Sequence, residues 1–191
     1  MNTLILVESP IKARSIAQYA RGAVDGAVLV RSTGGHLRDL PEGKLGVDVE
    51  HGFAPQYEVR NPRLAAALRP LVAQAGRVIL ATDPDREGEA IAWHITKVFE
   101  RELSGKQFWR ATFRAITREE VQAGLRRLRQ IDGNLVQAAV ARRVADRLIG
   151  YHLSPRLWAA LDGKDHGIGR VQAAALAMLR ANADQWEVQI A

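Results

Sequence analysis

Short apolar runs alternate with helix-like stretches along the first 130 residues of the chain. The runs at 4–7, 27–31, 77–81 and 108–113 have the length of strands and are bounded by polar or turn-forming residues. Helical spacing of apolar residues follows at about 11–20, 62–75, 87–103 and 118–129, with start signals at Pro10, Pro62 and Thr117. This alternation predicts an α/β fold in which helices flank a parallel sheet.

Two further segments depart from this alternation. Residues 37–61 contain several glycines and prolines and little periodicity, which predicts a long loop excursion. After residue 131 no strand pattern remains, and the stretches 134–150, 155–161 and 171–183 are helical in pattern. We therefore expect an α/β domain at 1–130 and an all-α segment at 131–191.

Four carboxylates occupy seven residues directly after the apolar run that ends at Ala81, at Asp83, Asp85, Glu87 and Glu89. Crowded ionised carboxylates repel one another, and a bound divalent cation removes that penalty. Mg²⁺ prefers hard oxygen ligands and usually leaves positions for phosphate oxygens, which favours phosphoryl-transfer chemistry. The structural alternative is an acidic helix start that interacts favourably with the helix dipole.

A second carboxylate source, Glu8, follows the first strand. Because the carboxyl ends of parallel strands meet at one edge of a sheet, Glu8 is expected to lie near Asp83 and Asp85. It suits a general acid or base beside a phosphate, and Lys12, one helical turn later, can neutralise phosphate charge. The sequence thus predicts Glu8 and Lys12 as catalytic residues, with an ordinary helix-start acid as the alternative for Glu8.

Composition changes this picture mainly through the placement of charge. Residues 1–100 carry 12 basic and 12 acidic residues, whereas residues 101–191 carry 15 and 9, so the net charge of +6 lies in the second part. Such an asymmetry indicates a polyanionic partner for that part. The chain has no cysteine, which excludes disulfides and thiolate metal sites. No apolar run approaches the ~20 residues of a membrane span, and we expect a cytoplasmic protein.

Several segments, taken together, resemble one known family. LVESPIKA at 6–13, GHLRDLP at 35–41 and TDPDREGEAIAWH at 82–94 resemble the TOPRIM domain, a Rossmann-like parallel sheet flanked by helices, of bacterial type IA DNA topoisomerases. ARRVADRLIGY at 141–151, LSPRLW at 153–158 and GRVQ at 169–172 resemble the helical DNA-binding segment that follows it. The matches span nearly the whole chain, and the helical ones make the resemblance specific to topoisomerases.

The resemblance implies roles for individual residues. It makes Glu8 the catalytic glutamate, which together with Asp83, Asp85 and Glu87 forms the Mg²⁺ site. It assigns contacts with single-stranded DNA to His36, Arg142, Arg143, Asp146, Tyr151 and Trp158, and to a loop formed by Gly167, Ile168, Gly169, Arg170, Val171 and Gln172. The family usually has Ser-Ala-Gly where this chain has Gly-Ile-Gly at 167–169, so a hydroxyl that can bind phosphate is absent.

The residues themselves support the DNA-binding roles to different degrees. Arg142, Arg143 and Arg147 cover one broad flank of a helix, which suits a phosphate track, although a solvated basic face is the alternative. Tyr151 and Trp158 can stack on bases or pack in a core. His36, which follows two glycines, can approach a nucleic-acid backbone or serve as a structural histidine.

Family members relax negatively supercoiled DNA by transient cleavage of one strand, strand passage and religation, and they use a nucleophilic tyrosine. No segment of this chain resembles the one that carries that tyrosine. We therefore expect the N-terminal part of a topoisomerase, an isomerase, which needs the tyrosine-bearing domains in cis or in trans and acts on a single-stranded segment of DNA. The alternatives are a stand-alone TOPRIM metal-dependent nuclease and a non-catalytic module that binds DNA or a topoisomerase.

Overall fold

A computed structural model describes residues 2–160 and 167–182 of the chain. Its contacts divide the chain into two units, Met1–Pro41 with Gln56–Val140, and Glu42–Pro55 with Ala141–Ala191. The domain boundary that we expect near residue 130 stays a prediction. No described helix combines the length and the apolar character that a bilayer crossing requires.

A four-stranded parallel sheet is the centre of the first unit. Its strands are β1 (Thr3–Val7), β2 (Val28–Ser32), β7 (Arg77–Leu80) and β8 (Phe108–Arg110), in the spatial order β2-β1-β7-β8. In the register of the sheet Leu4 lies opposite Leu29 on one side and Val78 on the other. All five residues of β1 are buried, as expected for a central strand that is covered on both faces.

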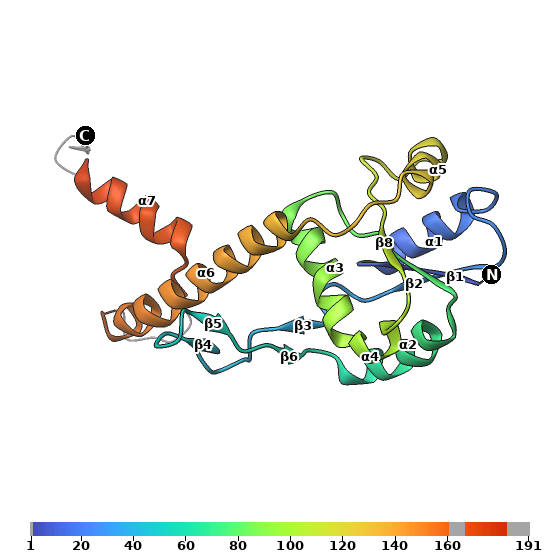
Figure 1. Ribbon diagram of the computed structural model, residues 1–191. Helices are drawn as coiled ribbons and strands as arrows, with labels where there is room; N and C mark the ends of the chain where they lie inside the picture. The colour runs from blue at the N-terminus through green and yellow to red at the C-terminus, as the bar shows by residue number, and fades with distance from the viewer. Residues whose placement is uncertain (1, 161–166, 183–191) are drawn as a thin grey trace. The chain divides into compact units, whose positions relative to one another are not determined.

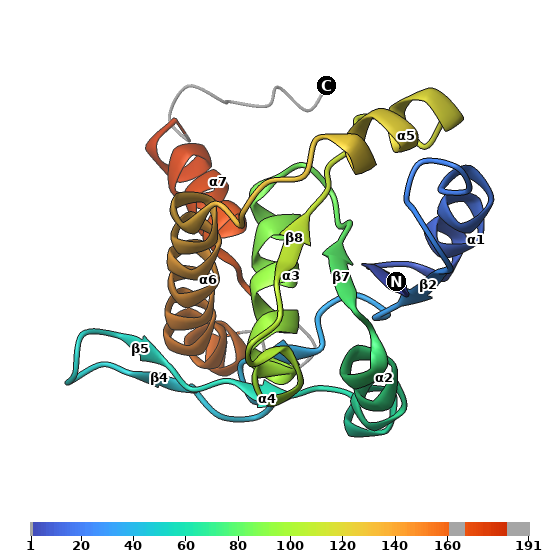
Figure 2. The same cartoon turned by 45° about the vertical axis from the view of Figure 1, so that its right-hand side comes forward.

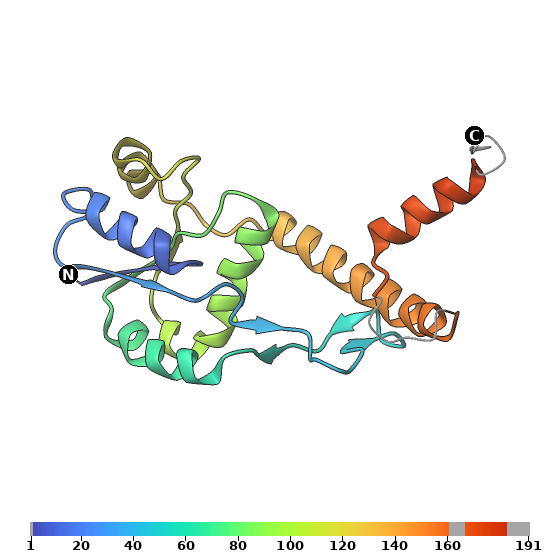
Figure 3. The same ribbon diagram turned by 180° about the vertical axis from the view of Figure 1, so that it is seen from behind.

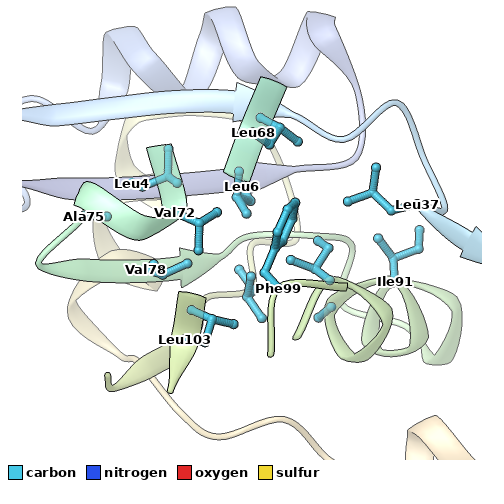
Figure 4. Close-up of a cluster of buried hydrophobic side chains, with 13 residues drawn as sticks. Leu4, Leu6, Leu37, Leu68, Val72, Ala75, Val78, Ile91, Phe99 and Leu103 are labelled. Carbon is cyan, nitrogen blue, oxygen red and sulfur yellow. The ribbon is translucent and has the colours of Figure 1, made fainter. Parts of the chain in front are cut away.

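Helices cover both faces of this sheet (Figures 1 and 2). The helices α1 (Pro10–Tyr19) and α5 (Arg118–Arg126) pack on one face, where Ile16 and Val121 meet Ile5 and Ile79. On the other face lie α2 (Pro62–Gln74), α3 (Arg86–Val98) and α4 (Glu100–Leu103). Figure 4 shows the core on this second face, which includes Leu6, Leu68, Val78, Ile91 and Phe99. The predicted α/β fold is confirmed.

The second unit contains a small β-ribbon and helices. Strand β4 (Val47–Asp48) pairs with β5 (Ala54–Pro55) in antiparallel fashion. This ribbon lies beside the C-terminal part of the long helix α6 (Gly133–Ala160), as Figures 1 and 3 both show, and Arg147 Nη1 donates a hydrogen bond of 2.8 Å to the carbonyl of Lys44. Helix α7 (Arg170–Ala181) follows. The predicted helical continuation is therefore confirmed.

Three expectations about individual helices and strands need correction. The helix expected over 87–103 breaks at Phe99, whose φ of −109° and ψ of 26° leave the helical region, and so forms α3 and α4. Conversely, 134–150 and 155–161 belong to one helix over its described part, because Pro155 lies inside α6 without ending it. Strand β8 ends at Arg110 rather than at Phe113.

The segment expected to be a loop excursion also contains regular structure. Besides the β4–β5 ribbon, β3 (Arg38–Asp39) pairs with β6 (Glu58–Val59) in antiparallel fashion. Strands of two residues are too short to show the alternation by which a sequence pattern identifies a strand. The excursion therefore forms two short ribbons, one in each unit.

Candidate metal centre and nucleic-acid interface

Glu8 is held at the carboxyl end of β1 through its backbone. Its carbonyl oxygen accepts hydrogen bonds from Gly35 N at 2.7 Å and from Ser32 Oγ at 3.1 Å. This approach requires a turn in which Gly34 and Gly35 have φ of 66° and 92°, a region that side chains other than glycine rarely occupy. The turn after β2 therefore fixes Glu8 and also places His36, the next residue.

Two carboxylates, that of Glu8 after β1 and that of Asp83 after β7, meet around the ammonium group of Lys12. Lys12 Nζ donates hydrogen bonds to Glu8 Oε1 and to Asp83 Oδ1. Burial lowers the pKa of Lys12, but the hydrogen bonds to Asp83 and Glu8 outweigh that effect and raise the pKa above its ordinary value. Glu8 is 13% exposed, and its second oxygen, Oε2, is buried without a hydrogen-bond partner among the described residues. An unpaired buried carboxylate oxygen is costly, so this oxygen has the chemistry to bind a cation.

The other two predicted metal ligands have different partners. Asp85 Oδ1 caps α3 by accepting a hydrogen bond of 2.7 Å from Gly88 N. Glu87 Oε1 lies 2.6 Å from His36 Nε2, and since an ionised carboxylate only accepts, this nitrogen carries the proton. Across residues 2–160 and 167–182, no three or more His, Asp or Glu side chains are grouped as a metal site.

The donor set nevertheless fits Mg²⁺. This ion is usually held by one or two carboxylates, while waters and substrate phosphates complete its octahedron. Glu8 and Asp83 supply two such carboxylates, and both already accept hydrogen bonds from the Lys12 ammonium group. Glu8 Oε2 has no hydrogen-bond partner among the described residues. The structure thus brings Glu8, Lys12 and Asp83 together and leaves Asp85 and Glu87 nearby in the chain with partners of their own.

A buried ion pair that the sequence analysis did not identify fixes the acidic loop. Arg110 of β8 and Glu89 of α3 are both fully buried, and Arg110 Nε donates to Glu89 Oε2 at 2.7 Å. The remaining guanidinium hydrogens of Arg110 bond the carbonyls of Thr82 at 2.8 Å and Asp83 at 2.5 Å. Burial raises the pKa of Glu89, but the hydrogen bonds from Arg129 and Asp132 N and the charge of Arg110 outweigh that effect and lower the pKa below its ordinary value. The fourth carboxylate of the acidic segment therefore serves the loop's position.

Gly88 allows α3 to begin directly against this loop. A Cβ atom added at Gly88 would lie 2.1 Å from the carbonyl oxygen of Asp83 and 2.7 Å from its nitrogen. Because both contacts are with backbone, no side-chain rotation relieves them. The glycine in the acidic segment is thus required by the close approach between the start of α3 and the backbone of Asp83.

His36 also contacts a cluster of rings around His94. The rings of His36 and His94 meet edge to face at 5.6 Å, and Arg38 Nε donates to His94 Nδ1 at 3.0 Å. The guanidinium of Arg38 lies over the rings of Tyr57 and Trp93, at 4.7 and 4.9 Å from their centroids. Burial, followed by the charges of Arg38 and His36, lowers the pKa of His94 to about 3. His94 is therefore a neutral acceptor that orients Arg38.

Several of the predicted DNA-contacting residues share a cavity in the second unit. The cavity has a volume of about 600 Å³, and its lining includes Arg143, Asp146, Tyr151 and Trp158. Tyr151 is 41% exposed and Trp158 is half-buried, so neither ring is enclosed in a core. The arginine and the two aromatic rings offer the combination of charge and stacking surface that single-stranded nucleic acids need. Arg142 lies outside this cavity lining and pairs with Asp146 Oδ2 at 3.6 Å.

The segment at 167–172 is attached to α6 by polar contacts. Arg170 Nε donates to Asp146 Oδ1 at 2.8 Å, and Ile168 N donates to Ser154 Oγ at 3.2 Å. Gln172 Oε1 accepts a hydrogen bond of 2.7 Å from Gly169 N at the start of α7. Asp146 therefore orients two arginines, and Val171 remains 71% exposed. His36 lies in the first unit and is not part of this group.

Comparison with known proteins identifies relatives for both parts of the chain. The family model for the Toprim domain matches residues 3–116, and the model for DNA topoisomerase matches residues 130–187. Among solved structures, full-length topoisomerase I from Thermotoga maritima is similar, with 39% sequence identity and a TM-score of 0.71. The match covers 81% of this chain and 26% of the Thermotoga chain. The chain thus spans about a quarter of the length of that relative.

Replacement of Arg110 by methionine tests the role of the buried pair. Arg110→Met leaves Glu89 buried with fewer partners, and loss of one member of a buried ion pair costs about 3–5 kcal/mol. We expect the free energy of unfolding, measured by urea denaturation, to fall by that amount. In the control, Arg69→Met removes the more exposed pair with Glu102 and is expected to cost less than about 1 kcal/mol. Equal losses in the two variants would contradict the assignment.

The buried His94 predicts a specific dependence of stability on pH. Its pKa is about 3 when folded and about 6.5 when unfolded, so between these values only the unfolded chain binds the proton. Stability is therefore lost as the pH falls below 6.5, by about 2 kcal/mol at pH 5. His94→Asn, which keeps an acceptor for Arg38, should remove this part of the difference between pH 7 and pH 5 in urea denaturation. His152→Asn, a change at an exposed ring, should retain it.

Proposed function

Because the chain belongs to the Toprim family and its second part to the DNA topoisomerase family, we propose that it is the metal-binding and DNA-guiding part of a type IA DNA topoisomerase. The complete enzyme relaxes negatively supercoiled DNA by cutting one strand, passing the other and resealing the cut. The meeting of Glu8 and Asp83 around Lys12 at the carboxyl edge of the sheet carries this proposal.

In the proposed site Glu8 and Asp83 hold Mg²⁺, and Asp85 and Glu87 contribute to the negative field around it. The ion, when bound, neutralises charge on a scissile phosphate as a Lewis acid. Glu8 gives and accepts the proton of the 3′-oxygen at the break. Lys12 Nζ, at the same edge, would contact a phosphate oxygen. The nucleophile is a tyrosine of the complete enzyme, and Tyr19, Tyr57 and Tyr151 do not serve in its place.

The second unit holds the strand in this proposal. Arg143 and its neighbour Arg142 contact phosphates, while Tyr151 and Trp158 stack on bases. Asp146 fixes the geometry of Arg142 and Arg170 through its two oxygens. His36, held by Glu87, contacts the backbone near the metal. The glycines at 167 and 169 let the backbone of the loop approach the strand.

Magnesium binding is the first step of the test. A ligand at ten times its Kd stabilises the folded chain by about 1.4 kcal/mol, so Mg²⁺ should raise the Tm. Glu8→Gln and Asp83→Asn should each abolish this rise, because each removes a ligand charge. Glu119→Gln, which alters an exposed acid at the start of α5, should leave it intact. A Tm rise that survives both site variants would rule out this metal site.

Activity is then tested by complementation. The purified chain, mixed with the remaining domains of a type IA topoisomerase, should relax negatively supercoiled plasmid in the presence of Mg²⁺. The Glu8→Gln chain should fail in the same mixture, whereas Glu119→Gln should succeed. Metal-dependent nicking by the wild-type chain alone, lost in Asp83→Ala, would instead identify a stand-alone nuclease. Wild-type mixtures that neither relax nor nick would contradict the catalytic proposal.

The aromatic contribution to strand binding gives a separate prediction. Tyr151→Ala should weaken binding of a labelled oligodeoxythymidylate by about 1–3 kcal/mol, the usual contribution of one stacked base. Tyr151→Phe keeps the ring and should bind nearly as well as the wild type. Fluorescence anisotropy at fixed salt measures both. Equal losses in the two variants would assign the effect to the hydroxyl and exclude stacking.

A further inference from the structure

A polar cavity of about 540 Å³ lies in the first unit, outside the acidic site and on the side of the sheet covered by α5. Its walls come from the acidic loop, the segment after β8, and α5 with the turn that follows it, and they include Pro84, Thr112, Arg114, Glu120, Arg127 and Arg129. None of these residues belongs to the metal or strand-binding groups described above. The cavity has a size that is ordinary for a ligand site.

The lining charges favour an anion. Three guanidinium groups face one carboxylate, that of Glu120. Arg129 is already engaged, because Glu89 accepts two hydrogen bonds from it, at 2.6 and 3.1 Å. Arg114 and Arg127 are exposed, and the side chain of neither has an ion pair with another described residue. Two arginines available to a ligand therefore border the cavity, against the single carboxylate of Glu120.

A close backbone approach builds this arrangement. A Cβ atom at Gly124 of α5 would lie 2.6 Å from the carbonyl oxygen of Thr112 and 2.4 Å from Cδ1 of Phe113. Only a residue without a side chain lets α5 pack this closely against the segment after β8. The contact brings Arg114, which follows Phe113, to the same cavity as Arg127, which follows α5.

The position of Pro84 connects the cavity to the metal site. Pro84 lies between Asp83 and Asp85 in the chain and forms part of the cavity wall. An anion in the cavity would thus lie on one side of the loop whose neighbouring residue, Asp83, pairs with Lys12 as Glu8 does. A single ligand that presents one phosphate to this acidic edge and another to the arginines fits both places, and a phosphodiester chain has this form.

We propose that this cavity is a second phosphate subsite, in which Arg114 and Arg127 bind a phosphodiester of the same single strand whose neighbouring phosphate lies at the acidic edge. The inference rests on the proposed function, because it takes a nucleic-acid strand as the ligand. Thr112 contributes a hydroxyl donor, and Glu120 limits the affinity by repelling the phosphate. The subsite fixes the register of the strand at the metal, separately from the stacking cavity of the second unit.

The salt dependence of strand binding tests the subsite. Binding of a labelled oligodeoxythymidylate to the full chain is measured by anisotropy at several salt concentrations without Mg²⁺. Each phosphate contact to a single strand contributes about 0.7 to the slope of log K against log salt. Because the two arginines share one phosphate, Arg114→Ala/Arg127→Ala should therefore lower the magnitude of the slope by about 0.7 and weaken binding. Glu120→Gln, which removes the opposing charge, should tighten it.

A control with equal charge separates the subsite from general attraction. Arg101→Ala/Arg126→Ala also removes two exposed arginines, but neither lines the cavity, and its slope should stay that of the wild type. Equal slopes in the two double variants would overturn the subsite, while a loss on Tyr151→Ala would still support the proposed function. A wild-type chain that binds no strand would overturn both. Displacement of the strand by thymidine monophosphate at comparable concentration would show a mononucleotide site and overturn the strand assignment.

Discussion

The buried pair between Arg110 and Glu89 is the interaction on which the geometry of the acidic edge depends. A loop that presents carboxylates to solvent at the end of β7 leaves its own carbonyls without partners in the sheet. The guanidinium of Arg110 donates hydrogen bonds to the carbonyls of Thr82 and Asp83. The carboxylate of Glu89 compensates the charge of this guanidinium. Removing two charges from water costs several kcal/mol per ion unless the geometry is complete. Here the cost is offset by the hydrogen bonds that hold the loop.

Lys12 gives the edge a charge balance that does not require a metal. Without its ammonium group, Glu8 and Asp83 repel each other, and burial of Glu8 raises the cost of that repulsion. With it, the two carboxylates lie close together, each bonded to the same ammonium group. A divalent cation held by Glu8 and Asp83 would have to displace Lys12 from the oxygens that it now bonds. Because Glu8 Oε2 has no described partner, one ligand position needs no such exchange.

The sequence predicts the periodic features well and the long-range ones poorly. Strand and helix patterns predict the sheet and its flanking helices because apolar periodicity reflects burial on a face. They do not predict the break at Phe99, which is buried between α3 and α4, or the passage of α6 through Pro155. In the sequence Glu89 is only the fourth of the crowded carboxylates after β7, and it is not among the predicted metal ligands. Its partners, Arg110 and Arg129, are 21 and 40 residues away, and no local spacing identifies them.

The arginines that make residues 101–191 positively charged have different roles in the structure. The positive excess of residues 101–191 indicates a polyanion partner, but not every arginine there is available to one. Arg110 and Arg129 neutralise Glu89 inside the first unit, and Arg142 and Arg170 share Asp146 in the second. Arg114 and Arg127, whose side chains pair with no acid in the described part of the chain, border a cavity beside the acidic loop. Net charge therefore indicates that a polyanion binds, whereas the pairing of each arginine determines where its phosphates can lie.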